Sequence, residues 1–476
     1  MRSVLETDGY KLSMAEAGWP LRPETFVYQH RKGGAQLLPL DVERAVRAAL
    51  PTPSPDDLAY LATVGYEMGA GFKAAMLRHD AVTVRALPKG AWFLPREPVF
   101  TVSGPSALVS WLEPLLLQLS YRVQVATLAR TDPAALAGAV GTVTCEEQRA
   151  IVLETLDAVG VAAPEVRVDE DGYRARVFAR ASELVRVTSS GARVFEVGLR
   201  AASCTAQHMV ALAACKEAGV ERTSHVLGAR RLGMTPVGTM GHEHVQRYGD
   251  DDDAFRAMRE RRPGRSSYLL DTFDTLRSGL PAALAILEED PSAGDSIRYD
   301  SGDKLAQYRH AVAEARRRGV RPVHILEDGF DAELTRAFER EREALGVPPG
   351  EQFYGYGGFL VSDGALTRDR VSAVYKLSRT GRRDVMKFAD EAGEGKRSLP
   401  GRPVVWRRVS GDGPDGIVGQ EGEPVADGYA LATGATADLG RPRGERVELG
   451  PATRALVERC ARARQEKLDR AKEASR

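Results

Sequence analysis

Several side chains that can do chemistry follow short apolar segments of this chain. Residues 297–303 read Ile-Arg-Tyr-Asp-Ser-Gly-Asp, so Arg298 and Asp300 alternate along the segment and point to the same side. Asp271 follows the apolar residues 267–270, and His242 ends a Gly-Thr-Met-Gly-His run. Carboxylates bind Mg²⁺, a guanidinium group binds an anion, and a neutral imidazole can act as a nucleophile. The combination indicates an active site where these segments end.

Alternating strands and helices must position these residues. From residue 194 to about residue 360, short apolar strands alternate with helical stretches, which are expected at 205–218, 252–259, 304–318 and 332–345. This repeat predicts an α/β domain, here an irregular, TIM-like barrel. Because such barrels carry their active sites at the carboxyl ends of the strands, the residues above are expected to meet there.

Both ends of the chain predict a second, α+β domain. The expected N-terminal elements are a helix at 10–17, strands at 25–30 and 82–86, and a helical stretch at 108–128. The expected C-terminal elements are strands at 372–377, 385–388 and 403–406, and a charged, exposed helix at 451–476.

These patterns divide the chain into four parts. Residues 1–128 and 361–476 are expected to pair into the α+β domain, and residues 194–360 to form the barrel. Residues 129–193 contain one clear helix, at 146–159, and are expected to be an inserted hairpin or lid.

Composition narrows the class of protein. A length of 476 residues favours two domains, and the equal counts of 66 basic and 66 acidic residues give no support for a nucleic-acid or membrane partner. The four cysteines are scattered, which argues against a disulfide framework or a structural zinc site. The most apolar stretch, 107–119, contains Glu113 and is too short to span a bilayer. With no leader pattern in residues 1–10, a cytoplasmic protein is expected.

An ordered series of motifs resembles the nicotinate phosphoribosyltransferase family, which are type II phosphoribosyltransferases. The motifs are Thr-Asp-Gly-Tyr-Lys at 7–11, Glu-Val-Gly-Leu-Arg at 196–200, Gly-Thr-Met-Gly-His at 238–242, Leu-Asp-Thr-Phe-Asp at 270–274, Arg-Tyr-Asp-Ser-Gly-Asp at 298–303, Glu-Asp-Gly-Phe-Asp at 327–331, Tyr-Gly-Tyr-Gly-Gly at 354–358 and Val-Tyr-Lys-Leu at 374–377. One such motif alone is weak evidence, whereas eight in the family's order are specific.

The resemblance implies an enzyme of NAD salvage. It would form nicotinate mononucleotide from nicotinate and phosphoribosyl pyrophosphate, coupled to ATP hydrolysis, with Mg²⁺ and without a tightly bound organic cofactor. It also implies a homodimer with shared active sites, in which Tyr10 and Arg31 of one subunit reach the barrel of the other.

The resemblance further implies roles for single residues. Arg298 would contact nicotinate, while Asp271 and Asp300 would lie near the ribose and the Mg²⁺-bound pyrophosphate. His242 would be phosphorylated by ATP, although His244 remains a rival two residues away. The other expected substrate contacts are Tyr10, Arg31, Val197, Arg200 and Ser224, with the glycine turns at Gly329, Gly357 and Gly358 for the 5′-phosphate.

Base selectivity depends on two of these positions. In the related nicotinamide enzyme an aspartate matches Ser224, and its absence here favours the negatively charged acid over the amide. The family's stacking phenylalanine is replaced by Val197, and the second arginine of that motif by Ala201.

Three alternatives remain open from the sequence. One is a related transferase that acts on nicotinamide, quinolinate or another base. Another is a barrel hydrolase with Zn²⁺ or Mn²⁺ held by His242, His244 and Asp300. The last is a non-catalytic descendant that binds nucleotide, for which Val197 and Ala201 are the motivating changes.

Overall fold

The computed structural model describes residues 2–290, 294–388, 397–433, 440–442 and 444–474. Its central element is a seven-stranded sheet in which all neighbouring strands are parallel. The strands are, in spatial order, β12 (Thr235–Pro236), β11 (Arg222–Thr223), β10 (Val194–Glu196), β16 (Gln352–Tyr356), β15 (Val323–Leu326), β14 (Ser296–Tyr299) and β13 (Ser267–Leu269). This is the strand order of a barrel in which β12 and β13, the two edge strands, are not paired with each other. The predicted TIM-like barrel is therefore confirmed, as an incomplete one.

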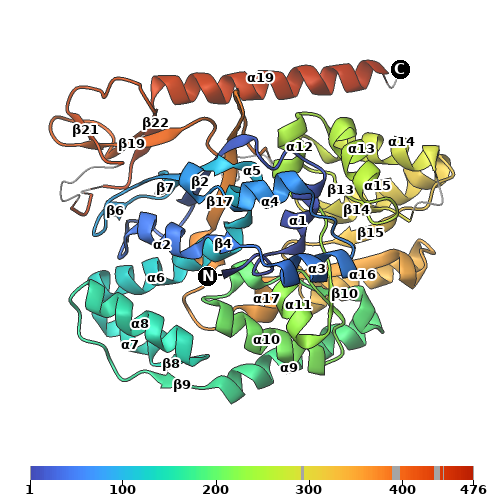
Figure 1. Cartoon of the computed structure of the whole chain (residues 1–476), viewed down its shortest axis with the longest axis horizontal. Coiled ribbons are helices and arrows are strands. Elements are labelled where there is room, and N and C mark those ends of the chain that lie inside the picture. Colours follow the sequence, from blue (N-terminus) through green and yellow to red (C-terminus); the bar gives the residue numbers. More distant parts are fainter. Residues whose placement is uncertain (1, 291–293, 389–396, 434–439, 443, 475–476) are drawn as a thin grey trace.

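Helices connect successive strands and cover the barrel (Figure 1). They are α10 (Thr205–Glu217), α11 (Val226–Leu232), α12 (His242–Tyr248), α13 (Asp251–Arg261), α14 (Leu280–Glu289), α15 (Lys304–Arg317) and α16 (Ala332–Ala344). Asp250, Asp303 and Asp331 cap three of them, each accepting a hydrogen bond from a backbone N–H of the first turn. The four helices predicted in this region thus begin and end within two residues of their expected bounds.

The N-terminal helix α1 (Gly9–Glu16) packs beside the open side of the barrel. A Cβ on Gly9 would overlap the carbonyl oxygen of Val237, and one on Gly238 would overlap the backbone of Gly9. Met14 lies against the same region, where its sulfur accepts a hydrogen bond from the Gly241 N–H at 3.1 Å. Two glycines therefore let α1 approach the loop after β12 closely enough to seal the gap.

The two chain ends share an antiparallel sheet, as predicted. Its order is β18 (Arg383–Asp384), β17 (Ala373–Thr380), β2 (Pro23–His30), β7 (Phe100–Pro105) and β5 (Thr83–Ala86). Strand β17 pairs with β2 from Ala373 opposite His30 to Thr380 opposite Glu24. Helices α5 (Ser106–Trp111) and α6 (Glu113–Thr131) replace the single predicted helix at 108–128.

The prediction of a strand at 385–388 is wrong. Strand β18 ends at Asp384, and the chain then runs as an irregular segment in which the Lys387 N–H donates to Ser398 Oγ at 2.7 Å. The hydrogen bond to the Ser398 side chain takes the place of a backbone bond to a neighbouring strand, and Lys387 lines the cavity described below.

The C-terminal region adds a sheet that the sequence analysis did not separate from the α+β domain. Strands β21 (Tyr429–Leu431), β19 (Pro403–Arg408), β20 (Gly416–Gln420) and β22 (Val447–Leu449) form it. The predicted charged helix is α19 (Pro451–Ala474), which runs along one edge of the molecule (Figure 1). Its exposure is incomplete, because Leu456 and Leu468 are buried and Arg464 donates to the Phe273 carbonyl at 2.6 Å.

The expectation of an inserted hairpin or lid at 129–193 is wrong. This segment contains α7 (Pro133–Val140), α8 (Glu146–Ala158) and α9 (Glu170–Thr188), with only a two-stranded parallel pair, β8 (Thr142–Val143) and β9 (Arg167–Val168). Helix α9 buries Tyr173, Val177 and Leu184 in the barrel core, so it is the first barrel helix. Only α7 and α8 pack in a separate cluster, against α6. No helix of the described residues is both long and apolar enough to cross a membrane.

Candidate active site

A cavity of about 280 Å³ lies between the carboxyl ends of the barrel strands and the antiparallel sheet. The barrel contributes residues that directly follow its strands, including Val197, Ser224, Asp300 and Glu327. The opposite wall comes from α1, α6 and β17. Eight predicted site residues line the cavity: Tyr10, Arg31, Val197, Arg200, Ser224, His242, Arg298 and Asp300.

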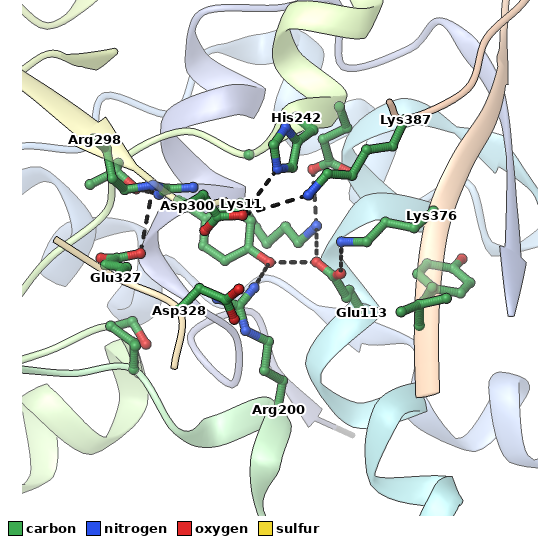
Figure 2. Close-up of a pocket in the computed structure, with 18 of the residues that line it drawn as sticks. Lys11, Glu113, Arg200, His242, Arg298, Asp300, Glu327, Asp328, Lys376 and Lys387 are labelled. Carbon is green, nitrogen blue, oxygen red and sulfur yellow. Dashed lines mark hydrogen bonds and ion pairs between the residues drawn. The ribbon is translucent and has the colours of Figure 1, made fainter. Parts of the chain in front are cut away.

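Two carboxylates and an imidazole meet at one end of the cavity. His242 Nε2 is 3.2 Å from Asp300 Oδ2 (Figure 2). The same atom is 3.7 Å from Asp271 Oδ1, and His242 Nδ1 is 3.1 Å from Thr272 Oγ1. Burial lowers the pKa of His242, so the imidazole is neutral at physiological pH. Burial opposes ionisation of Asp300, but the hydrogen bond from His242 and the nearby Lys387 hold its pKa well below the usual range.

The same cluster suits a divalent cation. The ligand atoms of His242, Asp271 and Asp300 lie within 4.8 Å of one another. Asp271 is 1% exposed; its Oδ2 accepts from Ser301 at 2.5 Å, whereas its Oδ1 is buried without a hydrogen-bond partner. An unpaired carboxylate oxygen is what an oxygen-binding ion such as Mg²⁺ requires, so the residues fit this metal. Lys387 Nζ, 3.6 Å from Asp300, supplies a positive charge at the same place.

His242, and not His244, belongs to the cavity. The Nε2–H of His244 donates to the Ala254 carbonyl at 2.9 Å, and its ring centroid lies 5.1 Å from that of Tyr248, with the two rings tilted by 57°. The trio of His242, His244 and Asp300 required by the metal-hydrolase alternative is therefore not assembled.

Arg298 lies across the cavity from the lysines, between two polar neighbours. It donates to the Thr239 hydroxyl, and its Nε is 3.6 Å from Glu327 Oε2. Burial raises the pKa of Glu327, despite the opposing effect of Arg298. Because its contact with Glu327 is long, at 3.6 Å, Arg298 can pair with a second anion.

A dense ionic network forms the wall opposite the barrel (Figure 2). The Tyr10 hydroxyl donates to Glu113 and accepts from Arg200 at 2.9 Å. Glu113 also pairs with Lys11 at 2.6 Å and with Lys376 at 3.3 Å. Burial opposes its ionisation, but Lys11 and Lys376 hold the pKa of Glu113 well below the usual range. Glu113 is thus the centre of this wall.

Two cations at the cavity margin have depressed pKa values. Burial lowers the pKa of Lys376 to about 8, with Glu113 opposing the shift. Burial and the neighbouring Arg368 and Arg96 lower the pKa of Arg31 to about 10. These clustered positive charges would be stabilised by a polyanionic ligand.

Tyr10 and Arg31 line the cavity of their own chain. The expectation that they also act in a partner's site stays a prediction. Tyr10 sits under Arg200, whose guanidinium carbon is 5.3 Å from the ring centroid.

Ser224 has a neighbour that the sequence analysis missed. Its hydroxyl donates to Asp8 Oδ1 at 2.6 Å, so a buried carboxyl group lies directly behind it. Burial raises the pKa of Asp8, which reduces the negative charge there. Val197 lines the cavity beside Phe195, which stacks on Phe353.

The predicted glycine turns lie next to the cavity, outside its described lining. Gly329 follows β15 with φ +74°, a left-handed conformation that favours glycine. Gly357 and Gly358 follow β16, where a Cβ on Gly357 would be 3.5 Å from the Val197 carbonyl oxygen. They are placed in successive strand-to-helix turns, as the sequence indicated.

Several cavity residues were not selected from the sequence. They are Lys11, Glu113, Glu243, Lys376 and Lys387. Lys11 and Lys376 stand inside motifs of the resemblance and could have been chosen there. The signal for Glu113 was a lone carboxylate in the most apolar stretch of the chain, where a buried charge requires a partner.

The chain is similar in sequence to proteins named nicotinate phosphoribosyltransferase. No model of a known protein family matches the chain. It is 27% identical over 372 residues to the human nicotinate phosphoribosyltransferase, covering 74% of this chain and 63% of that protein. It is 30% identical over 240 residues to a nicotinate phosphoribosyltransferase of Mycobacterium tuberculosis, covering 48% of each. The matches thus span less than two thirds of these relatives.

A solved structure shows the same fold. A putative nicotinate phosphoribosyltransferase from Saccharomyces cerevisiae superposes with a TM-score of 0.60 at 16% identity, over 83% of this chain and 94% of that one. This likeness shows the fold, and in sequence the chain is similar to proteins named nicotinate phosphoribosyltransferase.

Proposed function

We propose that this protein is a nicotinate phosphoribosyltransferase of NAD salvage. It would convert nicotinate, phosphoribosyl pyrophosphate, ATP and water to nicotinate mononucleotide, pyrophosphate, ADP and phosphate. The observation that carries the proposal is the placement of Arg298 and Asp300 in one cavity, with His242 and Asp271 beside Asp300. This arrangement supports the proposal, because a cation that could bind the base and carboxylates that could bind the ribose lie together at the carboxyl end of β14.

The carboxylates would act on the positive charge that develops at the anomeric carbon. Asp300 remains ionised because of His242 and Lys387, so it can stabilise that charge. Mg²⁺, held through Asp271 and Asp300 directly or through pyrophosphate, would offset the charge of the leaving group. Arg31, Lys376 and Lys387 would hold the remaining pyrophosphate oxygens, and the turns at Gly329 and Gly357–Gly358 would receive the 5′-phosphate.

The base would lie near Arg298. Its guanidinium group would pair with the nicotinate carboxylate, a pairing stronger than its 3.6 Å contact with Glu327. Tyr10 offers the aromatic face that Val197 lacks, and Ser224 presents a hydroxyl in place of a carboxylate. These features favour the acid over nicotinamide.

ATP coupling would use His242. For attack on the γ-phosphorus of ATP, the imidazole would take the tautomer with Nδ1–H donating to Thr272; Nε2 then gives up its hydrogen bond to Asp300, and its lone pair is free to react. The new N–P bond forms as the P–O bond to ADP breaks, and later hydrolysis of the N–P bond restores the imidazole and releases phosphate. The same proposal includes a homodimer and a cytoplasmic location, the latter supported by four cysteines that are all free.

The test is product formation from phosphoribosyl pyrophosphate and Mg²⁺, with nicotinate or nicotinamide, each with and without ATP. The proposal expects nicotinate mononucleotide, stimulated by ATP. If only nicotinamide gives product, the base that this enzyme uses is nicotinamide and not nicotinate. If the protein binds the mononucleotide without turnover, the non-catalytic alternative is favoured. Sedimentation of the same preparation checks the dimer.

A further inference from the structure

Two of the four cysteines lie side by side, although 59 residues separate them in the sequence. Cys145 Sγ and Cys204 Sγ are 3.7 Å apart, and both residues are 2% exposed. Cys145 is the N-cap residue of α8, and Cys204 is the N-cap residue of α10. The pair therefore joins the α7–α8 cluster to the barrel.

We propose that Cys145 and Cys204 are a redox modification site, at which a peroxide forms a reversible disulfide that acts on the turn carrying Arg200. A disulfide bond is about 2.05 Å long. Closing it from 3.7 Å requires a relative movement of less than about 2 Å. Such a shift is within reach of two loop residues at the starts of helices.

The surroundings favour oxidation of this pair. Both sulfurs sit at helix N-termini, where the helix dipole favours a thiolate. At Cys204, the hydrogen bond with Cys145 and burial raise the pKa, so Cys145 is the reactive sulfur of the pair. The hydrogen bond from Cys204 lowers the pKa of Cys145 to about 7, against the opposing effect of burial. Cys204 also lines a surface groove of about 300 Å³ together with Ser203 and Glu147, which gives a small oxidant a path to the pair.

The chemistry balances with a peroxide as oxidant. The Cys145 thiolate attacks a peroxide oxygen, so an S–O bond forms and the O–O bond breaks, releasing hydroxide. The Cys204 sulfur then attacks the sulfenic acid; the S–S bond forms, the S–O bond breaks, and the thiol proton leaves with the oxygen as water. Two thiols lose two electrons in total, and the peroxide is reduced to two waters.

The disulfide would affect the cavity through a short connection. Cys204 follows the turn η3 (Leu199–Ala201), in which Arg200 donates to the Tyr10 hydroxyl at 2.9 Å. In the reduced protein, Gln118 fixes the Leu199 carbonyl at 3.1 Å, and Glu147 accepts from the Ala206 N–H at 2.9 Å. Pulling Cys204 toward α8 would strain these contacts and displace Arg200, and displacement of a substrate-positioning group by about 1 Å can slow an enzyme about 10²-fold.

The experiment treats the full-length protein with hydrogen peroxide and maps its peptides without reduction. A Cys145–Cys204 linked peptide that dithiothreitol removes is expected, together with the loss of two titratable thiols. Cys145→Ser and Cys204→Ser should each abolish the linked peptide. Cys460→Ser, at a half-buried cysteine far from the pair in sequence, is the matched control and should leave it unchanged.

The effect on Arg200 rests on the proposed function and has its own readout. Peroxide should lower mononucleotide formation at least about tenfold in the wild type, reversibly, and not in Cys145→Ser. Absence of the linked peptide, or irreversible oxidation of both sulfurs, would overturn the modification site. A disulfide that forms without a change in rate would overturn its effect on Arg200. If the reduced protein forms no product, the proposed function fails, while peptide mapping still decides the site.

Discussion

Glu113→Gln removes the carboxylate that three cavity side chains share. Glu113 is 3% exposed and contacts Lys11 at 2.6 Å, Lys376 at 3.3 Å and the Tyr10 hydroxyl. Glutamine keeps the shape and one acceptor oxygen but not the charge. The substitution therefore separates the electrostatic role of this residue from its packing.

The expected loss of stability follows from the contacts that remain. Breaking a buried ion pair costs roughly 3 to 5 kcal/mol. Lys11 keeps Glu243 at 2.9 Å, and the amide oxygen can still accept from Tyr10, so we expect a loss of about 2 to 3 kcal/mol. Lys376 is partly exposed, so water replaces most of what it loses.

Chemical denaturation of both proteins measures this loss, with Glu154→Gln as the control. Glu154 pairs with Arg122 at 2.8 Å but is exposed, and an exposed pair contributes at most about 1 kcal/mol. Equal midpoints for Glu113→Gln and Glu154→Gln would refute the view that Glu113 is the centre of the wall.

The same variant changes the pH dependence of anion binding. Lys376 is protonated below its pKa of about 8, so its contribution to binding pyrophosphate is present at lower pH and is lost as the pH rises through that value. Glu113 raises this pKa, so its removal should move the loss to lower pH. Calorimetric titration of Mg²⁺-pyrophosphate between about pH 6 and about pH 10 tests it, with the wild type correcting for titration of the ligand. An unchanged profile would show that Lys376 does not bind this anion.

Three further substitutions test the other walls of the cavity. His242→Ala should abolish ATP stimulation but retain some ATP-independent transfer in the mononucleotide assay; equal loss of both would make His242 structural. Asp300→Ala should lower kcat by about 10²-fold or more, because it removes the charge nearest the anomeric carbon, and an unaffected kcat would reject that role. Ser224→Asp places a second carboxyl group near Asp8, which lies 2.6 Å from the Ser224 hydroxyl. The substitution should raise the KM for nicotinate more than the KM for nicotinamide, and Ser224→Ala is the control.

The sequence predicted the barrel well because its signals are local. Apolar strands, capping aspartates and helical periods recur between residues 194 and 360, and each is specified within about twenty residues. The division at residue 193 failed because α9 resembles a solvent-exposed, arginine-rich helix in sequence. Its burial of Tyr173 and Leu184 depends on α10 and α16, which follow it in the chain.

The sequence predicted the cavity residues that the barrel contributes, but only some of those on the opposite wall, formed by α1, α6 and β17. Arg298 lies near the carboxyl end of β14, Asp300 follows that strand, and His242 begins the helix after β12, where an active site is expected. Lys387 was assigned to a strand, because its inward orientation depends on a hydrogen bond to Ser398 that no local pattern reveals. The contact of Asp8 with Ser224 likewise joins residues 216 positions apart. The catalytic roles themselves stay predictions.

The pairing of β2 with β17 has a consequence for biosynthesis. Residues 23–30 form an inner strand whose one neighbour, β7, is complete once residue 105 has been made, whereas the other is not made until residue 380. During translation, the edge of β2 that later pairs with β17 therefore carries unpaired N–H and C=O groups while more than half of the chain is synthesised. Such an edge can pair with another nascent chain. Folding yield should consequently fall as protein concentration rises, and the cavity is completed only when β17 pairs with β2.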